Sequence, residues 1–223
     1  MSSLNMDKIA KAEGLIEDAL WQCVQDDDRQ KELAAYKEAK SILEELDVST
    51  PEERRERDRV LSYCLMRIDE TLINLGDDER GEERAREALE LAIQSENKVQ
   101  IARCHLSLGI RILSKGRVPE AEDQFRQIHK LSQEDKSEDM QQVLGWMFIV
   151  RTHILLGKSL YNQALAIAEH AAGILASIKN YAGLAAANKA LARVHESLGN
   201  SSKAEECRRI AESFERKAKK ERK

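Results

Sequence analysis

The sequence has few residues that interrupt helices and few that favour other kinds of secondary structure. Its 223 residues include only 2 prolines, 10 glycines and 4% aromatic residues, whereas 34% are charged. Proline and glycine are the main helix breakers, and strands are usually rich in aromatic and β-branched residues. This composition therefore predicts an all-α protein, and the chain is long enough to bury most of its apolar surface.

The sequence also lacks the patterns of a metal centre, a disulfide framework and a membrane span. No CxxC or CxxH spacing occurs, so the cysteines are expected to be buried, reduced thiols and no metal site or other cofactor is predicted. No window approaches about 18 apolar residues, and residues 1–14 contain no apolar core of a signal peptide. We therefore expect a soluble cytoplasmic protein, with a nuclear location left open. The four cysteines lie far apart, at Cys23, Cys64, Cys104 and Cys207.

Charge is distributed unevenly along the chain. The net charge is −4, but residues 208–223 contain eight Lys or Arg and three Glu. We predict that this segment continues a helix that ends the domain with a solvated outer face, followed by a basic tail at 216–223. The alternative is a nuclear-import or nucleic-acid patch. Because no aromatic residue follows Phe214 to stack on bases, nucleic acid is the less favoured partner.

One stretch, residues 101–131, shows how the helices are organised. Apolar residues recur every three or four positions on both sides of Gly116, with Pro119 where a new helix would begin. Two amphipathic helices joined by so short a turn must form an antiparallel hairpin. Small residues on the facing stripes, Gly109 and Ala121, allow the two helices to approach closely.

The hairpin belongs to a repeating series. Gly76, Gly116, Gly157 and Gly199 are each expected to end a helix, at intervals of 40, 41 and 42 residues. An inward-facing alanine follows each glycine, but the gap is longer after Gly76 and Gly157, which we interpret as longer turns or an added helical turn. A two-helix unit at this period predicts an α-solenoid. The inward-facing alanines are Ala85, Ala121, Ala164 and Ala204.

These residues resemble the tetratricopeptide repeat (TPR) family in a long-period form. The resemblance is strongest over residues 102–131, through Leu108-Gly109, Ile112, Gly116, Ala121 and Phe125. It implies a right-handed superhelix of about ten helices in antiparallel pairs, whose first helices line a concave groove that binds peptides or partner proteins. The expected domain covers residues 1–215, with a weak helix pair at 4–47 and repeats at about 51–96, 98–133, 138–178 and 181–215.

The resemblance also predicts which side chains line the groove. In this register Arg151 occupies the position that corresponds to Arg193 in the next repeat. A basic strip then follows the groove face of a chain that is otherwise acidic, and it would suit a partner with Asp, Glu or a C-terminal carboxylate. The alternative is that these cations only cover apolar surface or pair with neighbouring Glu. The asparagines of the chaperone-binding members are absent at the matching positions. The predicted groove residues are Arg103, Leu106, Met147, Arg151, Lys189 and Arg193.

No pattern of catalytic residues stands out. The string LLGKS at 155–159 ends like a phosphate-binding loop, but it lacks the first glycine and lies between two predicted helices rather than after a strand. His105, His153 and His195 fall near matching repeat positions and are expected to have packing roles, while His129 and His170 are expected on outer faces.

We therefore predict a non-enzymatic scaffold or adaptor that binds a protein or peptide partner. One alternative is a regulatory sensor module of a signalling system that binds a peptide or small effector. Another is a nucleic-acid-associated protein that uses the basic tail.

Overall fold

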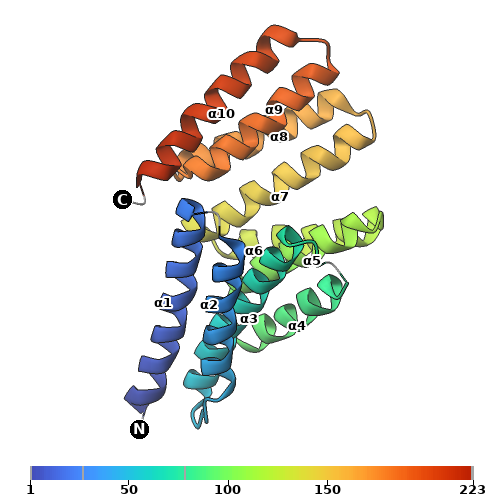
Figure 1. Cartoon of the computed structure of the whole chain (residues 1–223). Helices are drawn as coiled ribbons and strands as arrows, with labels where there is room; N and C mark the ends of the chain where they lie inside the picture. The colour runs from blue at the N-terminus through green and yellow to red at the C-terminus, as the bar shows by residue number, and fades with distance from the viewer. Residues whose placement is uncertain (1, 27, 78, 222–223) are drawn as a thin grey trace. The chain divides into compact units, whose positions relative to one another are not determined.

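The computed structural model describes residues 2–26, 28–77 and 79–221, and all the regular structure in this part of the chain is α-helical. Ten helices follow one another in antiparallel pairs, as the sequence predicts (Figure 1). Their bounds are α1 Ser2–Asp26, α2 Arg29–Glu44, α3 Pro51–Asn74, α4 Gly81–Gln94, α5 Lys98–Ser114, α6 Val118–Glu134, α7 Glu138–Gly157, α8 Tyr161–Ser177, α9 Tyr181–Ser197 and α10 Ser201–Glu221.

The helices form two compact units, which we describe separately. The N-terminal unit is Met1–Gln124 and the C-terminal unit is Phe125–Lys223, so the division falls within α6. The predicted repeats at 51–96, 98–133 and 138–178 coincide closely with the pairs α3/α4, α5/α6 and α7/α8. In the last pair, α10 continues through most of the segment predicted to be a tail.

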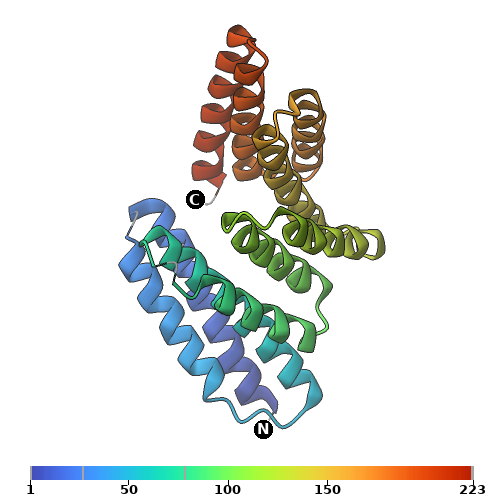
Figure 2. The ribbon, with the colours of Figure 1, turned by 90° about the vertical axis from the view of Figure 1, so that its right-hand side faces the viewer.

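The N-terminal unit is built by each helix packing on the next, from α1 to α5 (Figure 2). Its core contains Tyr36, which is fully buried in α2, and Cys64, whose thiol donates to the Tyr36 carbonyl over 3.1 Å. α3 contacts α1, α2, α4 and α5, so it is the central helix of this unit. Other fully buried side chains of this core include Ile9, Ile16, Leu43 and Val60.

The C-terminal unit uses small residues to bring its helices together. Ala164, Ala168 and Ala171 lie on one face of α8 and are fully buried. A Cβ at Gly145 or Gly183 would lie less than 3 Å from the Leu175 side chain, so α8 packs tightly against both α7 and α9 there. Glycine is required at these contacts because a larger residue would separate the helices.

The start of α3 follows the sequence signal closely. The Glu53 amide donates to the Thr50 hydroxyl over 3.1 Å, and the Thr50 amide donates back to the Glu53 carboxylate over 3.2 Å. With Pro51 as the first helical residue, this is a complete capping box. The predicted start at this position is confirmed.

The turns follow the prediction at three of the four glycines. Gly76, Gly116 and Gly199 have positive φ angles of 84°, 76° and 76°. Gly157 is the last residue of α7, as predicted, but it is Ser159 that takes the left-handed conformation, with φ 58°. The left-handed turn residue therefore lies two residues later than the glycine pattern predicts, and the turn from Ser159 to Ala164 has the same length as the turn from Gly116 to Ala121.

Candidate functional site

The largest hollow described on the C-terminal unit is a cleft of about 700 Å³ bounded by three helices. α9 forms its floor, and α7 and α10 form its walls. The floor includes Ala186 and Ala190, and Trp146 contributes an aromatic surface from α7. The residues lining the cleft are Trp146, Ile149, His153, Ala186, Lys189, Ala190, Ala192, Arg193, Glu196, Arg208, Ala211, Glu212 and Glu215.

Two ion pairs cross the cleft from α9 to α10. The Lys189 ammonium lies 2.5 Å from the Glu215 carboxylate. Arg208 on α10 pairs with Glu196 on α9 and, over 2.9 Å, with Glu205 on its own helix. These four cleft side chains are partly exposed, so the pairs lie at a solvated surface and each contributes at most about 1 kcal/mol to stability.

Two further charges in the cleft have no ion-pair partner among the described residues, namely Arg193 on α9 and Glu212 on α10. Arg193 lies near His153 on α7. Desolvation lowers the pKa of His153, and the positive charge of Arg193 lowers it further. The neutral form of the imidazole is therefore favoured, and Arg193 is the cation of this cleft that forms no ion pair with another described residue.

The displaced turn changes which residues of α7 and α9 are equivalent. Counted back from Ser159 and Gly199, Arg193 corresponds to His153, and Arg151 corresponds to Leu191. The expected equivalences of Arg151 with Arg193 and of His153 with His195 are therefore wrong. The reason is that the left-handed turn residue after α7 lies two residues later than the glycine pattern predicts. Arg151 is half-buried and lies outside the residues that line the cleft.

The six predicted groove residues are divided between the two units. Lys189 and Arg193 line the cleft of the C-terminal unit, whereas Met147 is fully buried and is not presented at a surface. In the N-terminal unit, the Arg103 guanidinium lies 5.7 Å from the centroid of the Tyr63 ring, and Leu106 is half-buried. A role of these residues in partner binding stays a prediction.

Sequence reasoning missed part of the cleft. The helical periodicity does not distinguish Trp146 from a core residue, and it predicts a packing role for His153, yet both line this surface. Glu212 and Glu215 were counted only as part of the basic terminal segment. Glu212 lies four residues after Arg208 and Glu215 lies three residues after Glu212, so the three share one face of α10, and this regularity was the available signal.

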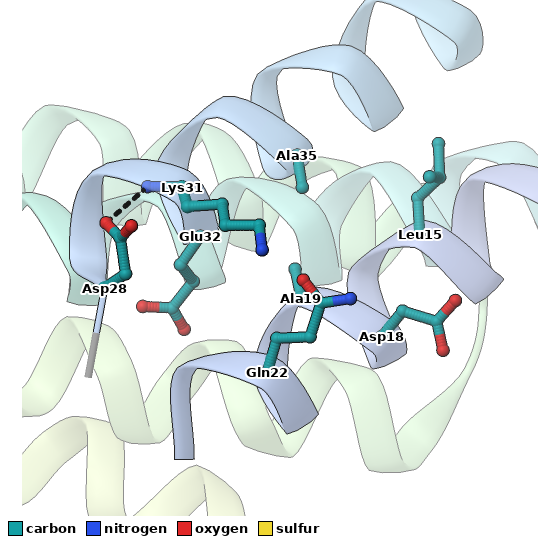
Figure 3. A pocket seen from close by; sticks show the side chains of 8 residues that line it. All are labelled: Leu15, Asp18, Ala19, Gln22, Asp28, Lys31, Glu32 and Ala35. Atoms are coloured by element: carbon teal, nitrogen blue, oxygen red, sulfur yellow. Dashed lines mark hydrogen bonds between the residues drawn. The ribbon is translucent and has the colours of Figure 1, made fainter. Parts of the chain in front are cut away.

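A second, smaller hollow lies in the N-terminal unit between α1 and α2 and has a volume of about 170 Å³ (Figure 3). Asp28 accepts a hydrogen bond from the Lys31 amide over 3.0 Å and so caps α2. Glu32 is buried and accepts from the Tyr36 hydroxyl over 2.8 Å. These polar groups therefore support the structure of α2.

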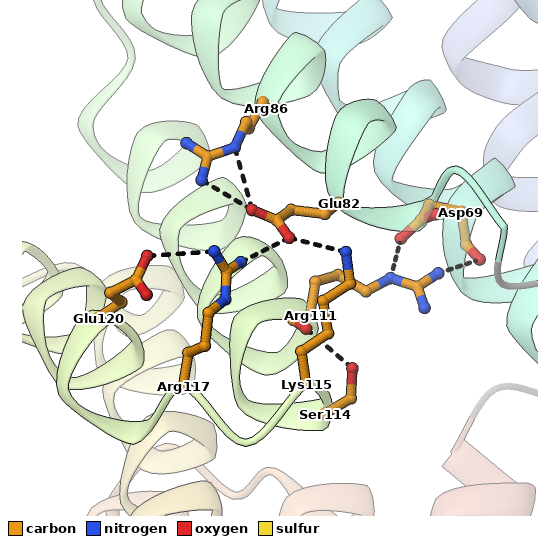
Figure 4. A network of polar contacts seen from close by, with 8 residues as sticks. All are labelled: Asp69, Glu82, Arg86, Arg111, Ser114, Lys115, Arg117 and Glu120. Atoms are coloured by element: carbon orange, nitrogen blue, oxygen red, sulfur yellow. Dashed lines mark hydrogen bonds and ion pairs between the residues drawn. The ribbon is translucent and has the colours of Figure 1, made fainter.

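A polar network connects successive helices of the N-terminal unit (Figure 4). Asp69 on α3 accepts from Arg111 on α5 over 2.7 Å and from Arg84 on α4 over 3.0 Å. Nearby, Glu82 binds three cations, and they lower its pKa to about 2. Because Asp69 and Arg111 are both buried, this network is a structural connection between neighbouring helix pairs. The three cations around Glu82, by decreasing effect on its pKa, are Lys115, Arg117 and Arg86.

Other candidate sites from the sequence have structural explanations. LLGKS forms the end of α7 and the start of the turn to α8, so it follows a helix and has no preceding strand to form a phosphate-binding loop. His105 bonds Gln124 over 2.9 Å, His195 is buried, and His129 and His170 are exposed as predicted. In the described part of the chain no group of three His, Cys, Asp or Glu side chains is placed to hold a metal ion. Among the same residues, no helix has both the length and the apolar character needed to cross a membrane.

Comparison with known proteins identifies the fold. No protein-family profile matches the sequence, and no curated protein does either. Solved structures match over nearly the whole chain. A Rap protein complexed with Competence and Sporulation Factor has a TM-score of 0.63 at 18% identity, covering 96% of this chain and 66% of the Rap chain.

Two other solved structures support the same conclusion. BtubC (BKLC) from P. vanneervenii has a TM-score of 0.58 at 17% identity, covering 96% of this chain and 91% of its own. A putative kinesin light chain with nearly identical TPR-like repeats from Podosopora anserina has a TM-score of 0.53 at 12% identity. The match covers 95% of this chain and 98% of that one. The chain therefore has the fold of TPR-like helical repeat proteins, which typically mediate protein–protein binding. At these identities the likeness shows the fold alone.

Proposed function

We propose that this protein is a non-catalytic scaffold or adaptor that binds a segment of a partner protein on the cleft of its C-terminal unit. The observation that carries the proposal is the cleft itself, in which Arg193 has no ion-pair partner among the described residues and Trp146 contributes an aromatic surface. A hollow with apolar walls and a few fixed charges is the usual form of a recognition site. The partner segment bears Asp, Glu or a terminal carboxylate, because an arginine guanidinium binds carboxylates in a bidentate manner.

The surrounding ion pairs set how the cleft selects its partner. Lys189 is held by Glu215, and Arg208 is held by Glu196, so an incoming carboxylate competes with the protein's own acids at these positions. At Arg193 it meets no such competition. Arg193 is therefore the principal anchor in this proposal, and Lys189 a secondary one. This arrangement favours a partner with a defined acidic residue over any polyanion.

The experiment is a binding titration with fluorescent peptides from a library of acidic sequences, with free and amidated C-termini. We expect Lys189→Ala with Arg193→Ala to reduce affinity by about tenfold or more, while Arg151→Ala alone has a small effect because Arg151 lies outside the cleft. Circular dichroism establishes that the variants remain folded. Unchanged binding by the double variant would exclude the cleft as the site.

A regulatory sensor module is the second candidate function. One observation favours it: the Rap protein with a similar fold was solved in complex with Competence and Sporulation Factor. In a sensor, the bound peptide changes the arrangement of the helices, whereas in a scaffold it only occupies the cleft. Small-angle scattering with and without the bound peptide distinguishes the two, since only a sensor changes its radius of gyration.

We place the protein in the cytoplasm and propose no cofactor for it.

Another protein of similar fold, aspartyl phosphate phosphatase F from Bacillus subtilis, is named as an enzyme, with a TM-score of 0.54 at 14% identity. That likeness concerns the fold. The non-catalytic proposal is supported by the charges of the cleft, which pair with one another or serve as anchors for a ligand.

A further inference from the structure

The last helix pair repeats the geometry of the pair before it. Ser159 and Gly199, the left-handed turn residues, are 40 residues apart. The first inward alanines after them, Ala164 and Ala204, are also 40 residues apart and are both fully buried. Residues 141–157 of α7 and all residues of α8 therefore have equivalents 40 positions later in α9 and α10.

The face formed by α7 and α8 already holds a helix, namely α9. α9 packs against both of them, and Leu175 of α8 lies so close to Gly183 that a Cβ there would approach its Cδ2 atom to 2.6 Å. Ala168 and Ala171 of α8 are fully buried. The contact that receives the next helix in this pair is the Leu175 side chain, against which the small residue Gly183 of α9 packs.

The equivalent face of α9 and α10 is the cleft. Ala211 corresponds to Ala171, so part of the small-residue surface is retained, and Ala186 replaces the much larger Trp146. At the edges the equivalent residues are charged, since Glu215 replaces Leu175 and Lys189 replaces Ile149. The face thus keeps the space for a helix but has a polar border, unlike a helix-packing face inside the repeat array.

We propose that this cleft binds a single α-helix of a partner protein, seated on α9 and α10 as α9 is seated on α7 and α8, with one acidic residue against Arg193 and one basic residue against Glu212. The inference rests on the proposed function of the cleft and specifies the conformation and chemistry of the bound segment. The partner helix presents small and apolar residues to Trp146 and the alanine floor.

Backbone chemistry favours a helix over an extended segment. The walls and floor of the cleft come from three α-helices, whose interior amides and carbonyls are bonded within their own helices. An extended peptide would find few backbone partners there, and burying its unpaired amides is unfavourable. A helix satisfies its own backbone groups and contacts the cleft through its side chains.

The charges specify the partner further. The titratable and charged groups around the cleft are His153 from α7, Lys189, Arg193 and Glu196 from α9, and Arg208, Glu212 and Glu215 from α10. Two pairs are already formed between α9 and α10, which leaves one cation and one anion without an ion-pair partner. A helix with one acid and one base in complementary positions satisfies both charges.

The test uses two display libraries. One presents single α-helices of the length of α9, 17 residues, on a helical miniprotein with a randomised exposed face. The other presents peptides of the same length that contain prolines and cannot form helices. Both are selected on the wild-type protein. We expect binders from the helical library to carry an acid and a base within one turn, and to lose at least about tenfold in affinity for the Arg193→Glu variant.

A charge exchange then gives the decisive comparison. A binder whose acid and base are interchanged should recover affinity for the double variant Arg193→Glu with Glu212→Lys. Arg209→Glu is the matched control, because Arg209 is exposed on α10 outside the cleft. The inference is overturned if no helical binder emerges, or if helical binders respond equally to the control and to the cleft variants. Binders found only in the proline library, and dependent on Lys189 and Arg193, would overturn the helix but leave the proposed function intact.

Discussion

Nε of Arg111 donates to Oδ2 of Asp69 over 2.7 Å, and both side chains are almost completely buried. The two residues are 42 positions apart in the sequence, so the bond joins α5 to the first helix of the preceding pair. Arg84 from α4 binds the other carboxylate oxygen over 3.0 Å. Three helices of the N-terminal unit are thus connected at one buried carboxylate.

Removing the carboxylate should be the most damaging change in this network. Asp69→Leu leaves the Arg111 guanidinium buried without its acid, and we expect a loss of about 3–5 kcal/mol of unfolding free energy. Arg111→Met should cost less, because Arg84 still pairs with Asp69. The loss of unfolding free energy in the double variant should be smaller than the sum of the losses in the two single variants. Urea unfolding of the four proteins tests this, and strict additivity would contradict a coupled buried pair.

Gly81 should not tolerate a side chain. A Cβ at this position would lie 2.5 Å from the Arg111 Cζ atom, and Arg111 is held by Asp69. We expect Gly81→Ala to lower the unfolding free energy by about 1–3 kcal/mol through overpacking. Gly14→Ala is the matched control, since nothing lies within 4 Å of a Cβ there and α1 should gain about 0.5–1 kcal/mol. Equal effects of both substitutions in thermal melts would disprove the contact.

Stability should depend on the ionisation of Glu82 in acid. Its pKa is about 2 in the folded protein, against an ordinary value of 4.5, because Lys115, Arg117 and Arg86 bind its carboxylate. A depressed pKa means that the stabilisation is fully present above about pH 4.5 and is lost as the pH falls toward 2. We expect Glu82→Gln to melt at a lower temperature than wild type at pH 6 and to converge with it near pH 2. A constant difference across this range would show that the carboxylate charge is not responsible.

The cysteines should differ in reactivity. Burial raises the pKa of Cys64 and Cys104 to about 12, so their thiols remain protonated at pH 8 and react slowly. Burial also raises the pKa of Cys207, but this residue is partly exposed. Thiol labelling followed by peptide mass spectrometry should modify Cys207 in the native protein, and Cys64 and Cys104 only after denaturation. Early labelling of Cys64 would contradict the packed core.

Most of the fold could be predicted from local patterns, and most of the candidate site could not. The capping box at Thr50 and the glycines at 76, 116 and 199 act on their immediate neighbours, so the sequence shows them directly. Gly157 has the same appearance, but it is still the last helical residue of α7, and Ser159 adopts the left-handed conformation in its place. That shift of two residues changes which residues of α7 and α9 are equivalent. For this reason the sequence pattern aligns Arg151 with Arg193 incorrectly.

Charges were hardest to interpret from the sequence. Lys189 and Arg193 are both cations on one face of α9, but within the described part of the chain only Lys189 forms an ion pair, with Glu215. Met147 has the spacing of a groove residue yet is fully buried. Whether a side chain is paired, buried or available depends on the helix opposite it, and no periodicity within one helix contains that information.

The sequence by itself determined that this chain is a series of α-helical pairs with a period near 40 residues, because helix propensity, caps, turns and apolar stripes are all local properties. The tertiary structure alone decided which side chains meet. It placed Asp69 against Arg111 and paired Lys189 with Glu215, and among the residues it describes it left Arg193 and Glu212 without ion-pair partners in the cleft of the C-terminal unit. These relationships depend on distances between residues far apart in the chain, and only packing fixes those distances.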